Sequence, residues 1–244
     1  MFLSIITPTF NSEKYIKRHI DSLNTQKKNF EQIIIDNISE DKTLEIIEKT
    51  ANYRFTIISE KDNGIYYAMN KGILKATGDY LLFLNSDDWI PEKTIELVAK
   101  EIKNNPNNDI YYGNSSYYKN NKKIFTQKSD IKNIFKTNSV SHQTMYYSKK
   151  VFIDKKFDTF YSVAADYDLS IKLVKNKYNF FYINKILSNN SIGGYSSNLL
   201  KSFDDFFEIQ KKNNGLIGYV NTIIEYNFKL LSILFKKIYA RISG

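Results

Sequence analysis

The sequence contains no cysteine, which excludes a disulfide framework, a thiol nucleophile, cysteine-type zinc sites and iron–sulfur clusters. Its two histidines are too few for a histidine-rich metal site. No window reaches the run of about 18 uncharged apolar residues that a membrane span needs, and the first residues carry no basic leader of a secretory signal. We therefore expect a cytoplasmic protein.

Two common nucleotide-binding fingerprints are also missing. No G-x-G-x-x-G motif follows the first apolar run, so a dinucleotide-binding fold lacks its marker. No G-x-x-x-x-G-K-[ST] motif is present either, which excludes a P-loop protein. Any nucleotide site in this chain must be built from other residues.

The composition is that of a folded protein. The 244 residues are 42% hydrophobic and 15% aromatic, which predicts one large domain, alone or with a small appendage. Lys and Arg number 35 against 26 Asp and Glu, so the net charge is +9. This charge leaves three partner classes open: nucleic acid, an acidic membrane surface or a phosphorylated substrate.

Short apolar runs alternate with amphipathic segments through the first 115 residues. This pattern predicts an α/β fold with a mostly parallel sheet and helices on both of its faces. The expected strands are 3–7, 32–36, 55–59, 79–84 and 109–112, and the expected helices are 12–26 (with Ser12 as its N-cap), 41–51, 66–76 and 91–104. Ligands of such sheets bind beyond the carboxyl ends of the strands. Four polar segments follow those ends: 7–11, 36–41, 59–65 and 85–89.

The second half of the chain has a different pattern. We expect a hairpin at 115–127, a short strand at 143–147, a helix at 165–175, a β-like segment at 178–183 and a turn at Gly193-Gly194. After Ser202 the chain is predicted to be helical and basic.

Several strand-end residues suit nucleotide or metal binding, each with a structural alternative. Acids directly after a buried strand, as in the segment 85–88, are costly unless they cap a helix or bind a cation. Asp36 suits hydrogen bonds to a ribose or base, or is a turn residue. Asp62-Asn63-Gly64 is a turn signature, and Lys61 and Lys71 are either phosphate contacts or ordinary surface lysines.

Two acids open the helix at 165–175. Asp166 and Asp168 either stabilise the helix dipole, or one of them serves as a general base. Their spacing of two places them on different sides of the helix, so at most one is expected to face a pocket. His142, just before a β-like run, is either a hydrogen-bonded structural residue or a ligand.

Taken together, the strand-end motifs resemble the inverting glycosyltransferase family 2, which has the nucleotide-sugar-binding GT-A fold. The matching stretches are 4–11, 35–43, 59–72 and 76–88, and the third is especially similar to bacterial exopolysaccharide and O-antigen transferases such as those of colanic acid synthesis. The resemblance covers roughly residues 1–200. It implies a catalytic domain at 1–200, with a nucleotide-sugar-binding half at 1–115 and an acceptor half at 116–200, followed by a basic amphipathic helical tail at 201–244.

The resemblance also implies roles for individual residues. The implied nucleotide-sugar-binding residues are Thr7, Pro8, Thr9, Asn11, Asp36, Asn37, Asp62, Gly64, Asn70, Lys71, Asn85, Ser86 and Asp87. Asp87 is the implied ligand of Mg²⁺ or Mn²⁺, with Asn85 in the first position of the family's D-x-D motif. Asp166 matches the family's catalytic base, with Ala165 replacing the Glu of its E-D pair. The acceptor side is implied to include Asp88, His142, Gln143, Gly193 and Gly194.

The expected function is therefore metal-dependent inverting transfer of a sugar, from a UDP-sugar first or a GDP-sugar second, to a hydroxyl of a glycan or lipid-linked acceptor. The expected setting is synthesis of surface polysaccharide such as lipopolysaccharide. Two rivals are a noncatalytic nucleotide-sugar binder and a basic nucleic-acid-binding protein. Against the second rival, the aromatic residues are spread through apparent core strands, so we expect no nucleic acid partner.

Much of the positive charge lies in the C-terminal tail. Between Lys211 and Gly244 there are six Lys and Arg and one Glu, a net charge of +5, interleaved with apolar residues at helical spacing. This pattern predicts a basic amphipathic helix, with residues 215–244 resting on an anionic membrane at the inner face of the cell membrane. The alternatives are a helix packed on the catalytic domain or a homodimer contact.

Overall fold

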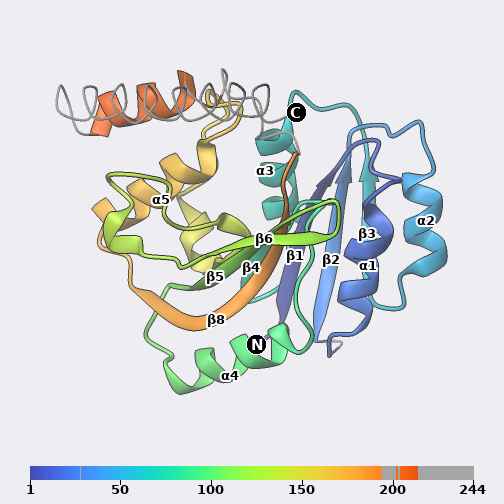
Figure 1. The fold of residues 1–244 in the computed structure, drawn as a ribbon, viewed down its shortest axis with the longest axis horizontal. Helices are drawn as coiled ribbons and strands as arrows, with labels where there is room; N and C mark the ends of the chain where they lie inside the picture. The colour runs from blue at the N-terminus through green and yellow to red at the C-terminus, as the bar shows by residue number, and fades with distance from the viewer. Residues whose placement is uncertain (28, 194–201, 203, 214–244) are drawn as a thin grey trace, which may run out of the picture.

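The computed structural model describes all residues except 28, 194–201, 203 and 214–244, so Gly194 and the predicted membrane tail lie outside the described residues. Its centre is an eight-stranded sheet with helices on both faces (Figure 1). In chain order the elements are β1 (Leu3–Thr9), α1 (Ile16–Asn24), β2 (Phe30–Asp36), α2 (Thr43–Thr50), β3 (Phe55–Ser59), α3 (Ile65–Lys75), β4 (Tyr80–Phe83), α4 (Thr94–Asn104), β5 (Ile110–Lys119), β6 (Lys122–Gln127), η1 (Ile131–Asn133), η2 (His142–Thr144), β7 (Tyr146–Ser148), η3 (Lys149–Ile153), α5 (Ala165–Lys175) and β8 (Phe180–Ser191).

The first four strands are parallel and end at one edge of the sheet. The order is β3-β2-β1-β4-β7-β5-β6, and β8 pairs with β5. In the register of this sheet Thr9 lies opposite Asp36, and Asp36 lies opposite Ser59. β7 runs antiparallel to both β4 and β5, whereas β5 and β8 are parallel. This confirms the mostly parallel sheet and brings the polar segments after β1, β2, β3 and β4 to one edge.

Two hydrophobic cores, one on each face, hold the helices to the sheet. Alternate residues of β1 divide between them: Ile6 packs with Met69 of α3 on one face, and Ile5 packs with Ile20 of α1 on the other. α5 joins the first core, and α2 and α4 join the second. Each fully buried Ile or Leu contributes roughly 1.5–3 kcal/mol to this packing.

Four local predictions differ from the structure. The short strand expected at 143–147 is β7 at Tyr146–Ser148, because His142–Thr144 form the 3₁₀ turn η2. Ser12 is not the N-cap of α1, which begins at Ile16; the Ser12 hydroxyl bonds Ser86 (2.8 Å) and the Phe10 carbonyl instead. The helix expected from residue 91 begins at Thr94, because a turn follows the proline. The segment expected at 178–183 continues as the long strand β8.

Among the described residues, no helix combines the length and the apolar surface needed to cross a bilayer.

Candidate functional site

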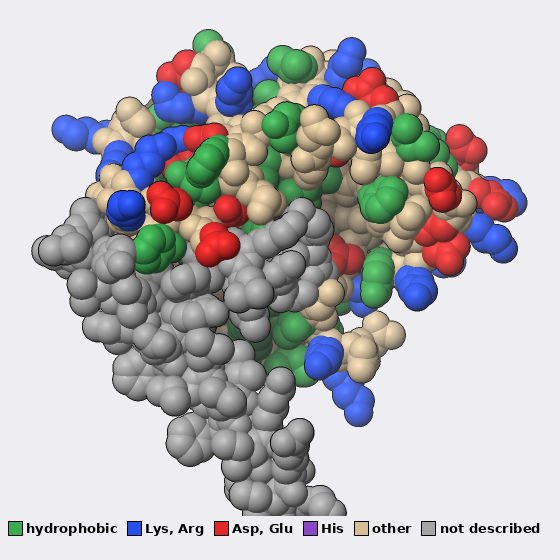
Figure 2. Space-filling view, turned by 90° about the horizontal axis from the view of Figure 1, so that it is seen from above, with side chains coloured by type: hydrophobic (Ala, Val, Ile, Leu, Met, Phe, Trp, Pro, Cys, Tyr) green, Lys and Arg blue, Asp and Glu red, His purple; other side chains and the backbone are tan. Residues whose placement is uncertain are grey.

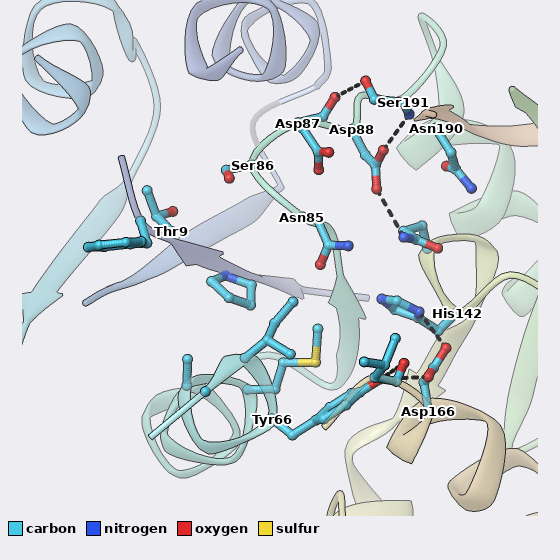
Figure 3. Close-up of a pocket in the computed structure, with 18 of the residues that line it drawn as sticks. Thr9, Tyr66, Asn85, Ser86, Asp87, Asp88, His142, Asp166, Asn190 and Ser191 are labelled. Atoms are coloured by element: carbon cyan, nitrogen blue, oxygen red, sulfur yellow. Dashed lines mark hydrogen bonds and ion pairs between the residues drawn. The ribbon is translucent and has the colours of Figure 1, made fainter. Parts of the chain in front are cut away.

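A cavity of about 570 Å³ opens where the carboxyl ends of the parallel strands meet η2 and the start of α5. Figure 3 shows residues from these elements facing one another around it. Thirteen of the residues singled out from the sequence lie on its wall: Pro8, Thr9, Asn11, Asn37, Asp62, Gly64, Asn85, Ser86, Asp87, Asp88, His142, Gln143 and Asp166. Segments far apart in the chain therefore share one site.

Two predicted nucleotide contacts, Thr7 and Asp36, lie behind the wall rather than on it. The Thr7 hydroxyl is buried and accepts a hydrogen bond from the Gln32 amide (2.8 Å). The Asp36 carboxylate is fully buried and accepts three hydrogen bonds: from the Ser39 amide (2.9 Å), the Ser39 hydroxyl (2.5 Å) and the Ser59 hydroxyl (2.7 Å). In this structure Asp36 therefore holds the ends of β2 and β3 together, as its turn interpretation requires.

Asn70, Lys71 and Gly193 also lie outside the wall. The Asn70 amide donates to the Phe157 carbonyl (2.9 Å) and accepts from the Phe157 N–H (3.0 Å), tying α3 to that segment. Lys71 forms an ion pair with Glu60 (2.8 Å). Gly193 is exposed and has φ +117°, a backbone conformation that favours glycine, so the predicted turn forms there.

One end of the cavity is formed by the loop Asn85–Asp88 after β4. We name it the donor end, after the role that the sequence resemblance implies for this loop. Burial raises the pKa of Asp87, against the weaker opposing effects of its own loop backbone and the Arg18 charge. The Asn85 Oδ1 atom is buried and has no hydrogen-bond partner among the described residues. Asp87 and Asn85 are thus the two oxygen-bearing side chains of this loop that remain open to a ligand.

Arg18 of α1 supports this loop from outside the cavity. Its guanidinium donates to the Asp87 carbonyl (3.0 Å) and the Ser191 hydroxyl (2.8 Å), and it lies 3.7 Å from the centre of the Trp89 ring. Sequence reasoning missed this residue, because nothing in an amphipathic helix indicates which arginine will reach a loop 69 positions away.

Asp88, which follows Asp87 in the chain, faces away from the open part of the cavity. Its carboxylate is buried and accepts from the Ser191 N–H (2.8 Å) and from the Gln143 amide (2.9 Å). Burial and the adjacent Asp87 charge raise the pKa of Asp88 well above its ordinary value. Asp88 therefore joins the loop to η2 and β8.

The other end of the cavity contains Asp166 at the start of α5. We name it the acceptor end, after the role that the sequence resemblance implies for it. The Tyr66 hydroxyl donates to its Oδ1 (2.7 Å), and the His142 Nδ1 lies 2.8 Å from its Oδ2 (Figure 3). Burial alone would raise the pKa of Asp166, but the His142 and Tyr66 contacts hold it below its ordinary value. Asp168 points elsewhere and pairs with Lys172 (2.5 Å), which confirms that only one of the two acids faces the pocket.

Tyr66 and the pairing of His142 with Asp166 were not predicted from the sequence. In the sequence His142 lies 24 residues and Tyr66 lies 100 residues before Asp166, and no short motif joins them. The only signal was the resemblance, which placed His142 on the acceptor side without a role.

The charged residues on the described cavity wall are all acidic. Four acids line it, Asp62, Asp87, Asp88 and Asp166, whereas no Lys or Arg does so among the described residues. On the face shown in Figure 2 the Lys and Arg side chains are scattered among Asp, Glu and other side chains. The described part of the wall therefore offers no basic side chain to a polyanionic ligand.

The donor end fits a divalent cation that is shared with a phosphorylated ligand. The described residues contain no group of three or more His, Cys, Asp or Glu able to hold a metal on their own. Mg²⁺ is commonly held by one or two carboxylates while phosphate oxygens and water complete its octahedron. Asp87 and the unpartnered Asn85 oxygen meet that requirement.

Residues 4–184 match the family described as Glycosyl transferase family 2. A PGL/p-HBAD biosynthesis glycosyltransferase of Mycobacterium tuberculosis is 32% identical over 179 residues, covering 71% of this chain and 70% of that protein. The Staphylococcus aureus poly(ribitol-phosphate) β-N-acetylglucosaminyltransferase TarS is 36% identical over 108 residues, covering 42% of this chain and 19% of that protein.

Solved structures give the same fold. The structure of TarS 1–349 with UDP has a TM-score of 0.67 at 24% identity, covering 86% of this chain and 64% of that one, so this chain spans less than two thirds of it. The mannosyltransferase PcManGT of Pyrobaculum calidifontis, in complex with GDP-Man and Mn²⁺, has a TM-score of 0.70 at 14% identity, covering 99% of this chain and 75% of that one.

Proposed function

The chain belongs to glycosyl transferase family 2, with the GT-A fold, and from this premise we propose that it is a metal-dependent inverting glycosyltransferase. The proposed reaction moves a sugar from a nucleoside-diphosphate donor to a hydroxyl of a glycan or lipid-linked acceptor. The observation that carries the proposal is the acidic cavity itself, with Asp87 open at one end and Asp166 paired with His142 at the other.

In this proposal residues 1–115 hold the donor and residues 116–200 hold the acceptor. A UDP-sugar is the first expectation, supported by the TarS structures with UDP and UDP-GlcNAc, and a GDP-sugar is the second, supported by PcManGT with GDP-Man. Of the residues implied by the resemblance, Thr9, Asn11, Asn37 and Asp62 lie where a nucleoside would meet the strand ends.

Asp87, with the Asn85 oxygen beside it, is proposed to hold Mg²⁺ or Mn²⁺ together with the donor diphosphate. The cation, when bound, supplies the positive charge that stabilises the departing nucleoside diphosphate. The wall lacks Lys and Arg among its described residues, so this charge has no other described source in the cavity.

At the acceptor end Asp166, which is paired with His142, is proposed to act as the general base that takes the proton of the acceptor hydroxyl. The hydroxyl oxygen attacks the anomeric carbon on the face opposite the diphosphate, and a single displacement inverts that centre. No second carboxylate nucleophile is required, unlike in a retaining glycosidase.

A donor screen tests this proposal. The protein is incubated with a panel of UDP- and GDP-sugars and Mg²⁺ or Mn²⁺, and the released nucleoside diphosphate is measured. Release with one donor class, abolished by chelation, is the expected result. Binding without release would favour the noncatalytic binder, and salt-dependent retention on DNA in place of donor binding would favour the nucleic-acid-binding protein.

We place the enzyme in surface glycan synthesis, such as lipopolysaccharide, in the cytoplasm at the inner face of the cell membrane. The names of the relatives support a role in glycan synthesis: one concerns PGL/p-HBAD biosynthesis and another poly(ribitol-phosphate). The membrane contact is assigned to the basic tail 215–244, which lies outside the described residues, with a homodimer contact as the alternative. Flotation with anionic liposomes, with and without residues 215–244, tests this placement; equal flotation of both forms would exclude it.

A further inference from the structure

Two neighbouring residues of α1, Arg18 and His19, bond successive backbone carbonyls of the loop Asn85–Asp88. We infer that His19, together with Arg18, is a positioning residue that holds this loop in the conformation in which it binds the cation and the donor diphosphate. The ligand in this inference is that of the proposed function, whereas the role of His19 in holding the loop rests on contacts within the protein.

His19 is fully buried, and both of its ring nitrogens have partners. Its Nδ1 atom lies 2.8 Å from the Asp88 carbonyl oxygen. Because a carbonyl oxygen only accepts hydrogen bonds, Nδ1 carries a hydrogen. Burial lowers the pKa of His19 to about 4, so the ring is neutral at neutral pH and Nε2 has a lone pair. Nε2 therefore accepts from the Gln32 amide (2.7 Å), and the orientation of the ring is fixed.

Buried hydrogen bonds connect His19 to the sheet. The Gln32 amide of β2 donates to His19 and to the Thr7 hydroxyl of β1 (2.8 Å). The Gln32 Oε1 atom accepts from the Tyr53 hydroxyl (2.7 Å). Because these groups are buried, removing one of them leaves its partners unpaired at a cost in stability. The Asp88 carbonyl is thereby tied to β1 and β2, two interior strands of the sheet.

Arg18 holds the preceding carbonyl of the loop. Its guanidinium donates to the Asp87 carbonyl (3.0 Å) and lies 3.7 Å from the centre of the Trp89 ring. With the carbonyls of Asp87 and Asp88 both bonded, the peptide planes that follow these two residues are fixed, which limits the directions that the Asp87 side chain can take. Neither Arg18 nor His19 lines the cavity, so both act on a ligand only through the loop.

A displaced loop would weaken cation binding more than it would weaken the chemical step. Mg²⁺ demands near-ideal octahedral geometry, so a carboxylate ligand such as Asp87 has to be held in one direction. Groups that orient a metal ligand from behind typically change metal affinity or activity about 10- to 100-fold when they are replaced. The expected signature of a lost His19 contact is therefore a higher requirement for the cation and the donor.

Two substitutions separate the two sides of the His19 ring. Asn places its amide where His has Nδ1, so His19→Asn keeps a donor for the Asp88 carbonyl and loses the acceptor for Gln32. Gln places its amide near the position of Nε2, so His19→Gln keeps an acceptor for Gln32 and loses the donor for the loop. Each variant leaves one buried polar group unpaired, so both should lower Tm by a similar amount, roughly 2–10 °C.

Only His19→Gln should weaken the ligand site. Its half-saturating Mn²⁺ concentration and its donor KM are expected to rise about tenfold, whereas in His19→Asn both stay within about threefold of wild type. In both variants kcat at saturating Mn²⁺ and donor should fall less than about threefold, because Asp87 and Asp166 are unchanged. Lys17→Ala is the matched control on α1, since it removes only an exposed pair with Asp21, and should behave as wild type.

Trp89 provides a measurement that requires no activity. It is the only tryptophan of the chain and directly follows the loop, so its fluorescence in the metal-free protein reports where the loop lies. His19→Gln should increase the quenching of Trp89 by acrylamide, and hydrogen exchange of a peptide that spans 84–90 should become faster. His19→Asn and Lys17→Ala should leave both measurements at their wild-type values.

Arg18→Met is the second variant, for the case in which a His19 variant does not fold. It keeps an apolar side chain on α1 and removes the bond to the Asp87 carbonyl. Losing a positive charge would by itself tighten the binding of a cation, so a severalfold rise in the half-saturating Mn²⁺ concentration identifies the loss of the hydrogen bond. An unchanged or lower Mn²⁺ requirement in Arg18→Met contradicts the inference.

The two His19 variants decide between positioning and mere stability. Wild-type Mn²⁺ dependence and Trp89 quenching in His19→Gln, or a change in His19→Asn as large as in His19→Gln, would overturn the inference. If the wild-type protein releases no nucleoside diphosphate from any donor, the proposed function fails. Trp89 quenching and hydrogen exchange would then still decide whether His19 holds the loop.

Discussion

The two ends of the cavity shift the pKa values of their acids in opposite directions. At the donor end burial raises the pKa of Asp87, which the Arg18 charge outside the cavity opposes only in part, whereas at the acceptor end His142 and Tyr66 hold the pKa of Asp166 below its ordinary value. Both carboxylates lie in one cavity on one protein. On the proposed function, positive charge would arrive with the ligand at the donor end, whereas the fold already provides a partner for the acid at the acceptor end.

Removing the acid at the donor end should have the largest effect on catalysis. Asp87→Asn is expected to lower transfer by about 10³-fold or more, because the charge that neutralises the leaving group loses its protein ligand. Nucleoside diphosphate release and calorimetric donor binding, each with and without Mn²⁺, measure this loss. Wild-type turnover that is unaffected by EDTA would contradict the metal-dependent part of the comparison.

Removing the acid at the acceptor end should give a different kinetic signature. Asp166→Asn is expected to lower kcat about 10²- to 10³-fold, because the proposed general base is lost, while the donor KM stays within about threefold. Steady-state kinetics with varied donor distinguishes the two ends. A large rise in donor KM in this variant would show that the two ends are not separate.

A smaller effect is expected from Tyr66→Phe, which removes one of the two hydrogen bonds to Asp166 and keeps the ring. One hydrogen bond to a charged group is worth about 1.5 kcal/mol, so kcat should fall roughly tenfold. The same assay measures it, with thermal unfolding as the folding control. A Tyr66→Phe enzyme with the kcat of wild type would show that this bond has no part in positioning the pair.

Stability should change in opposite directions at the two ends. In EDTA at pH 7, Asp166→Asn should lower Tm by roughly 2–8 °C, since it loses about 1–2 kcal/mol of hydrogen bonding. Asp87→Asn should raise Tm, since it removes a buried carboxylate whose charged form is disfavoured.

The pH dependence sharpens this contrast. The folded pKa of Asp166 lies below its unfolded value of about 3.9, so its stabilisation is present above that pH and disappears as the pH falls through the folded pKa. The folded pKa of Asp87 lies above its unfolded value, so its cost is present above the folded pKa and disappears as the pH falls to about 3.9. Both differences from wild type should therefore shrink in acid, as scanning calorimetry from pH 7 to pH 3 would show.

The smallest effect on catalysis is expected from Asp168→Asn. This acid is buried on α5, two residues from Asp166, but pairs with Lys172 outside the cavity. Its loss should reduce Tm while kcat and donor KM stay within about twofold of wild type. A large loss of activity would mean that the acceptor end depends on α5 as a whole rather than on the His142–Asp166 pair.

The parts of the site that follow from sheet geometry were predictable. Parallel strands end at one edge, so the polar residues after them, among them Asn85, Asp87 and Asp62, can be grouped from the order of strands and helices in the chain. The helices on both faces followed from the same alternation of apolar runs. For these features, hydrophobic periodicity and strand order are nearly sufficient to predict where the residues lie.

The hydrogen-bond partners of each acid were not predictable. Asp36 and Asp88 stand at strand ends as Asp87 does, yet their oxygens are used by Ser39, Ser59, Ser191 and Gln143. The acceptor end depends on how an irregular segment brings η2 against α5, and no periodic pattern encodes that approach. Ser12 shows the same limit, since it bonds Ser86 across the cavity edge instead of capping α1.

Asp88 connects the loop Asn85–Asp88 to β8 and η2. Its two oxygens are bonded to the Ser191 N–H and to Gln143, the neighbour of His142. A shift of the loop would therefore break one of these bonds or move the end of β8 or η2 with it. If the proposed donor binds against this loop, the connection predicts an ordered kinetic scheme in which the donor binds before the acceptor.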